Sequence, residues 1–154
     1  MTGRLHAIHT SPGGVPKLAR ESCIVTFGGL EGDWQRDREH HGGPDRAVSL
    51  FSLEVIRALQ AEGHPIAPGT TGENLTLEGF AWTDLGPGLR VAIGDVELQI
   101  VSYAAPCNNI NGSFSDGRSV RVSQKVHPGW SRLYARVLAE GKLRVGDAVR
   151  VLQG

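Results

Sequence analysis

Cys107 follows a stretch whose pattern predicts a β-strand, and its thiol is the chain's clearest candidate for chemistry. In residues 96–100 apolar side chains alternate with polar ones, which is the period-2 pattern of a strand with one buried face. Pro106 has no backbone N–H and fixes its own φ, so we expect the strand to stop there and to hold Cys107 at its end. An accessible thiolate can bind a soft metal or carry sulfur. A lone cysteine is also commonly a small buried apolar residue, so the pattern alone leaves these roles open.

A long polar segment, 28–46, is the second place where reactive side chains gather. Its candidate residues are Arg36, Arg38, His40, His41, Asp45 and Arg46. A loop this long in a compact domain is usually functional or disordered, and its glycines, charges and paired histidines favour a site over a solvated excursion. His40 and His41 are adjacent, so their side chains point in opposite directions on an extended chain, which disfavours a shared metal site. A zinc site that joins Cys107 to one of these histidines stays open.

Glu73 and Asn74 present a carboxylate and an amide at the start of another predicted strand. Either residue can also cap or bridge backbone groups in a turn, as Asn beside glycine usually does. Familiar motifs are absent, because the sequence has no Cys-x-x-Cys, His-Glu-x-x-His, P-loop or strand-linked Gly-x-Gly-x-x-Gly. No motif therefore predicts a zinc ribbon, a zincin or a nucleotide-binding protein.

Short strands and two helices are predicted to position these groups. The period-2 stretches predict strands at 4–9, 21–27, 47–51, 73–77, 89–93, 96–102 and 148–152. Helices are predicted at 53–62, where Ser52 has the character of an N-cap, and at 130–139, where apolar residues including Leu133 and Val137 have helical spacing. We expect a mainly β fold, a β-barrel with a few short helices covering its openings.

Length and charge limit the classes of function. The chain has 154 residues, a patterned apolar body and no linker, which predicts a single domain over 1–154. Sixteen basic and sixteen acidic residues balance, so no strong field favours nucleic acid or a membrane surface as a partner. No apolar run approaches the roughly 18 residues of a membrane span, and the first nine residues lack the apolar run of a signal peptide. We therefore expect a cytoplasmic protein with reduced thiols, in which Cys23 is a core residue.

Five separated motifs resemble those of MOSC domains and stand in the same order. They are GLEGD at 29–33, HHGGPDRAV at 40–48, GTTGENL at 69–75, IGD at 93–95 and PC at 106–107. The likeness covers nearly the whole chain. It is greatest for the stand-alone bacterial branch, which has the Pro-Cys form and a late segment similar to YARVL at 134–138.

The resemblance implies a β-barrel fold and the molybdenum cofactor (molybdopterin). MOSC domains occur fused to the sulfurase that matures this cofactor, and they form the catalytic part of enzymes that reduce N-hydroxylated compounds. Cys107 matches the family's protein ligand to molybdenum, and Asn74, beside Glu73, matches a position close to the cofactor. Arg46, with Arg36 and Arg38, is a candidate to hold the cofactor's phosphate by forked hydrogen bonds. His40, His41 and Asp45 belong to the same implied cofactor-binding loop.

Two functions follow from the resemblance. In the first, the chain is a molybdenum-dependent enzyme that reduces an N-hydroxylated small molecule to the amine. Because the sequence has no flavin, iron–sulfur or haem motif, its electrons would come from a separate reductase. In the second, Cys107 carries sulfur as a persulfide, or docks the cofactor without turnover, and a sulfur donor is the partner.

The sequence departs from the family's longer members. The enzymes that reduce amidoximes have an extra N-terminal domain and an Arg-Cys form, whereas these residues show neither and have Pro106 before the cysteine. The pyridoxal-phosphate sulfurase portion is also missing from these residues, so we do not expect this chain alone to desulfurate free cysteine. The substrate contacts are therefore not implied by the resemblance.

Overall fold

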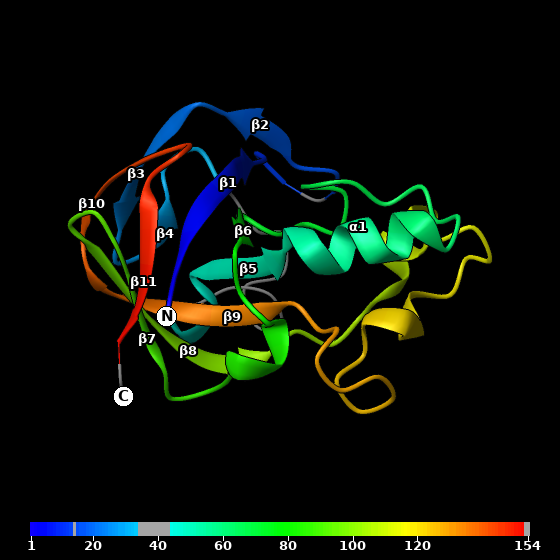
Figure 1. The fold of residues 1–154 in the computed structure, drawn as a ribbon. Helices are drawn as coiled ribbons and strands as arrows, with labels where there is room; N and C mark the ends of the chain where they lie inside the picture. Colours follow the sequence, from blue (N-terminus) through cyan, green and yellow to red (C-terminus); the bar gives the residue numbers. More distant parts are fainter. Residues whose placement is uncertain (14, 34–43, 153–154) are drawn as a thin grey trace.

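The structure, a computed structural model, describes residues 1–13, 15–33 and 44–152 (Figure 1). Its strands are β1 (Thr2–Thr10), β2 (Leu18–Arg20), β3 (Ser22–Thr26), β4 (Gly29–Leu30), β5 (Val48–Ser52), β6 (Leu75–Glu78), β7 (Arg90–Ile93), β8 (Val96–Tyr103), β9 (Leu133–Ala139), β10 (Gly141–Arg144) and β11 (Ala148–Leu152). The helices are α1 (Leu53–Ala61) and four short 3₁₀ segments, η1 (Pro44–Arg46), η2 (Trp82–Asp84), η3 (Asn108–Ser113) and η4 (Ser119–Val122).

The main sheet closes on itself and forms a barrel. Its hydrogen-bonded order is β11-β7-β8-β9-β5-β6-β1, and β1 pairs with β11 again, for example at Gly3 opposite Val149. The pairs are antiparallel except β5 with β6, where Leu50 lies opposite Leu75. β2 extends the sheet beside β1, and β10, β3 and β4 form a second, three-stranded sheet. The predicted mainly β barrel is confirmed.

Alternating residues of the barrel strands fill its interior. Fully buried side chains include Leu5, Leu50, Leu75, Ile93, Leu98 and Ile100. Each comes from a stretch whose period-2 pattern predicted a strand with one buried face, and burial of such side chains supplies the main stabilisation of the fold. Cys23 on β3 is also buried, as predicted.

α1 is the one α-helix of the described residues, and it packs beside β5 and β6 (Figure 1). Ser52 caps it as predicted, because the Ser52 Oγ accepts a hydrogen bond of 3.1 Å from the Val55 N–H. Leu53, Val55, Ile56 and Leu59 form its buried face. Across the described ranges, no helix is both long and apolar enough to cross a membrane.

The helix predicted at 130–139 is wrong, since Leu133–Ala139 is strand β9. The apolar positions fit helical spacing, but Leu133, Ala135 and Val137 also alternate, and all three are buried. Two neighbours decide between these patterns, because β9 pairs with β8 on one side and with β5 on the other. Backbone pairing across the barrel thus overrides the local helical pattern.

Candidate functional site

Cys107 lies just beyond the end of β8, where the sequence predicted it. The strand ends at Tyr103, and Cys107 is the N-cap of η3 with an extended backbone. The Cys107 carbonyl accepts hydrogen bonds from Ile110 N (3.2 Å) and from Ser119 Oγ (3.4 Å). Its thiol is free and partly exposed. The backbone bonds therefore fix a residue that stays partly exposed.

β9 presents polar side chains to this region. Arg132, just before the strand, alternates with Tyr134 and Arg136, so the three share one face. The Arg46 guanidinium carbon lies 5.4 Å from the centre of the Tyr134 ring, a cation–π distance. Arg136 forms a salt bridge of 3.0 Å with Asp45. These two contacts attach η1, the C-terminal end of the 28–46 segment, to β9.

Arg132 is a buried cation between two loops. Its side chain donates to the Thr71 carbonyl through Nη1 (2.7 Å) and to the Ala105 carbonyl through Nη2 (3.3 Å). Within the described residues its Nε has no hydrogen-bond partner, and the residue is 7% exposed. Burial lowers the pKa of Arg132, and Tyr134, Glu73 and Cys107 oppose that change when they are ionised.

Burial also controls the ionisation of the neighbouring acids. Desolvation raises the pKa of Glu73, although a hydrogen bond of 2.9 Å from Thr71 Oγ1 to its carboxylate favours the charged form. Desolvation raises the pKa of Tyr134 too, with Arg132 and Arg46 acting in the opposite direction. The Tyr134 phenol is therefore neutral at physiological pH.

Asn74 is fully buried and connects three separate segments. Its amide oxygen accepts from Ser49 N (3.0 Å), and its amide nitrogen donates to the His9 carbonyl (3.2 Å) and to Asp33 Oδ2 (3.0 Å). The side chain therefore binds β5, β1 and the end of the 15–33 range together. That is the bridging role open to an asparagine near a turn, and a contact with a cofactor stays a prediction.

Asp33 and Lys17 form a buried ion pair beside Asn74. Lys17 Nζ lies 2.9 Å from Asp33 Oδ2, and the two side chains are 7% and 4% exposed. The Ser11 N–H donates to the other Asp33 oxygen at 3.0 Å. Asp33 thus accepts three hydrogen bonds at the point where the 34–43 segment begins.

The structure brings together only part of the predicted site. Arg46 and Cys107 both lie near Tyr134, and Glu73 and Cys107 both act electrostatically on Arg132. Arg36, Arg38, His40 and His41 lie outside the described residues. A single pocket that joins the whole loop and Asn74 to Cys107 therefore stays a prediction. Among the described residues, no group of three or more His, Cys, Asp or Glu side chains is arranged to hold a metal ion.

Arg132, Tyr134 and Arg136 are the site residues that sequence reasoning missed. With 130–139 predicted as a helix, these three residues were not expected to share one face. The signal that finds them is the alternation of polar or aromatic residues at 132, 134 and 136 with apolar residues at 133, 135 and 137. Read with a period of 2, it places all three on one face.

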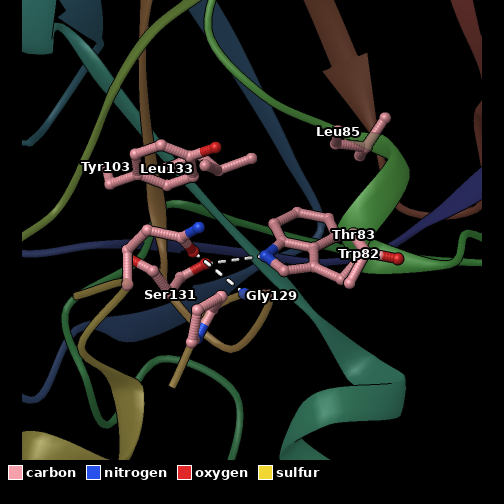
Figure 2. A pocket seen from close by; sticks show the side chains of 9 residues that line it. Trp82, Thr83, Leu85, Tyr103, Gly129, Ser131 and Leu133 are labelled. Atoms are coloured by element: carbon pink, nitrogen blue, oxygen red, sulfur yellow. Dashed lines mark hydrogen bonds between the residues drawn. The ribbon is translucent and has the colours of Figure 1, made fainter. Parts of the chain in front are cut away.

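A small cleft of about 180 Å³ lies on the other side of β9 (Figure 2). Ser131 and Leu133 line it, and they alternate with Arg132 and Tyr134 along the chain. The Trp82 indole reaches across it and donates to the Ser131 carbonyl at 2.7 Å. None of the predicted site residues lines this cleft.

The sequence model of the MOSC domain matches residues 37–150, most of the chain. The chain belongs to the MOSC domain family. This MOSC domain is 28% identical to YflK of Bacillus subtilis (strain 168) over 141 residues, 90% of this chain. It is also 28% identical to YiiM of Escherichia coli (strain K12) over 149 residues, 92% of this chain. The chain spans 63% of the length of YflK and 65% of the length of YiiM.

Solved structures share the fold of this MOSC domain. YuaD from Bacillus subtilis superposes with a TM-score of 0.75 and 20% identity, over 98% of this chain and 96% of that one. YiiM from Escherichia coli gives a TM-score of 0.72 and 23% identity, over 98% of this chain and 70% of that one. At these identities the likeness establishes the β-barrel arrangement alone.

Proposed function

We propose that this MOSC domain binds the molybdenum cofactor through Cys107 and reduces N-hydroxylated small molecules to the corresponding amines. The observation that carries the proposal is a free cysteine, partly exposed and held just beyond the end of a barrel strand, two residues after a carbonyl that the Arg132 guanidinium bonds. Family membership supports it, because MOSC domains are associated with this cofactor.

The side chains around Cys107 fit such a cofactor. A soft metal bound to a pterin dithiolene needs a soft protein ligand, which a cysteine thiolate provides. The cofactor's phosphate needs cationic donors, and Arg46 lies on the same side of β9 as Tyr134 and Arg132. The unpartnered Nε of Arg132 shows that the described protein groups do not fully satisfy this buried cation. We assign Cys107 as the metal ligand and Arg46, with Arg36 and Arg38, as the phosphate contacts.

The remaining residues have supporting roles in this proposal. We assign His40, His41 and Asp45 to the cofactor contacts, and the Asp45–Arg136 salt bridge holds η1 on β9. Glu73 and Asn74 are both fully buried, and we assign them a role in holding the site from within the fold. A neutral Tyr134 phenol, next to two arginines, can donate a proton in a hydrogen bond without losing it.

The reaction needs electrons from outside the chain. Converting an N–OH group to N–H releases the oxygen as water and takes up two electrons and two protons. The cofactor, when bound, supplies the centre that removes the oxygen and receives the electrons. The protein's part is to hold that centre and to orient the substrate, and a separate reductase completes the cycle.

A sulfur or cofactor carrier is the second candidate function. The other cysteine, Cys23, is buried on β3, and burial raises the pKa of its thiol. A persulfide on Cys107 would therefore have no reactive neighbouring thiol from Cys23 to discharge it. That isolation suits a carrier as well as a metal ligand.

Metal analysis of freshly purified protein separates the two candidates. Stoichiometric molybdenum with pterin, together with reduction of a hydroxylaminopurine or an amidoxime by an artificial electron donor, is the expected result. Cys107→Ser should abolish metal retention and turnover while keeping the fold, because a hydroxyl is a hard group that rarely ionises near neutral pH. Cys23→Ser is the matched control and should keep both. Protein that binds cofactor but never reduces these substrates would refute the reductase, and a persulfide without metal would support the carrier.

A further inference from the structure

We propose that Arg132 is a positioning residue that clamps the Cys107 segment to the turn before Glu73. The inference rests on the proposed function of Cys107 as the metal ligand. One guanidinium bonds the carbonyl of Ala105, two residues before Cys107, and the carbonyl of Thr71, two residues before Glu73. These segments are 34 positions apart in the sequence, so Arg132 joins parts of the site that local structure does not hold together.

The side chain is an arginine for a physical reason. Its planar fork donates in two fixed directions, so it reaches two carbonyls on different loops, whereas a lysine ammonium is a single point. Burying this charge is costly, and no carboxylate of the described residues lies within salt-bridge distance of it. A buried cation whose donors bond two backbone carbonyls, instead of a carboxylate, indicates that holding those two carbonyls in place is its role.

The clamp acts on a short and otherwise loosely held stretch. Ala104 is fixed independently, because its N–H donates to the Arg132 carbonyl (2.9 Å) and its carbonyl accepts from Ser131 Oγ (3.3 Å). Those contacts do not involve the Arg132 side chain. Ala105 is exposed, and Pro106 has no N–H to donate. The guanidinium bond to Ala105 therefore holds the last part of the chain before the thiol.

The rate of turnover depends more on the exact position of a metal ligand than on how tightly the ligand binds the metal. A ligand displaced by about 1 Å can still bind while turnover falls steeply. Loss of the clamp should therefore lower kcat strongly and change KM little. It should also loosen both carbonyl-bearing segments at once, while the barrel strands away from them stay as they are.

The test compares Arg132→Gln and Arg132→Lys with Arg90→Gln as the matched control. Arg90 lies on β7, which pairs with β8 and β11, and it forms a salt bridge of 3.4 Å with Glu97. Amide hydrogen exchange is measured on peptides covering 104–110, 69–74 and, as an internal reference, 148–152. Both Arg132 variants should speed exchange by about tenfold in the first two peptides, because each loses charge-assisted hydrogen bonds. The reference peptide and the Arg90 variant should be unchanged.

Activity and metal content complete the test. With cofactor bound, the Arg132 variants should retain molybdenum but lose at least about tenfold in kcat at nearly constant KM. If Arg132→Lys restores wild-type exchange and kcat, charge alone suffices and the clamp is refuted. Unchanged exchange in whichever variant folds also refutes it. If wild-type protein binds no molybdenum, the proposed function fails, and the exchange experiment still decides the clamp.

Discussion

Removing Lys17 should destabilise the protein substantially, because it leaves a buried carboxylate without its cation. In Lys17→Met the Asp33 carboxylate loses the 2.9 Å contact to Nζ and keeps two neutral donors, Ser11 N and the Asn74 amide. Breaking a buried pair by removing one partner costs about 3–5 kcal/mol. Because two donors remain, we expect a loss of about 3 kcal/mol, the lower end of that range.

The assay is urea denaturation of the wild type, Lys17→Met, Asp33→Asn and the double variant at neutral pH. In a thermal melt of the same variants, a loss of about 3 kcal/mol corresponds to a fall in Tm of roughly 6–12 °C for a chain of this size. The double variant should recover most of the loss, since Asn keeps an oxygen for the Ser11 N–H and no buried charge is left uncompensated. A single-variant loss below about 1 kcal/mol, or a double variant that is no better than Lys17→Met, would refute this account of the pair.

The other predictions concern the helix cap and two buried titratable groups. Ser52→Ala should lower the free energy of unfolding by about 1 kcal/mol in urea denaturation, because the Val55 N–H loses its acceptor, whereas Ser52→Thr should lose less. Burial raises the pKa of Glu73, so the folded protein loses stability as pH rises above the unfolded pKa of about 4.3. Glu73→Gln should therefore be more stable than wild type at neutral pH. An equal or lower Tm of this variant would contradict the prediction. The pKa of His9 is lowered by burial and by the positive charges of His6 and Lys17, so the unfolded chain binds more protons below about pH 6.5 and stability should fall there. His9→Gln should flatten that fall when unfolding is measured between about pH 5 and pH 8.

The strands around Cys107 could be predicted because their signals are local. Alternation along Val96–Tyr103 and the imino ring of Pro106 both act within a few residues, and they placed the cysteine close to where it lies. The resemblance to MOSC domains, carried by five motifs in the same order, added the expectation of a β-barrel. The cap of α1 was equally local, since Ser52 and Val55 are three residues apart.

The rest of the site depends on contacts between distant residues. Asn74 bonds Asp33 and His9, which are 41 and 65 positions away, and no pattern in the sequence indicates those partners. The sequence of β9 fits both a helix and a strand, and its pairing with β5 and β8 decides for the strand. With its type wrong, the shared face of Arg132 and Tyr134 could not be recognised.

The pairing of β1 with β11 means that the barrel closes between strands at opposite ends of the described residues. Thr2 pairs with Arg150, so the β11 side of β1 stays without its partner until β11 has left the ribosome. An unpaired strand edge is a template for aggregation, and contacts this distant in sequence slow folding. Arg4 and Arg150 place charge on the paired edges of β1 and β11, which disfavours pairing with a second chain. Production of the protein should therefore depend on chaperone supply and growth temperature more than a barrel of this size with local strand pairings would.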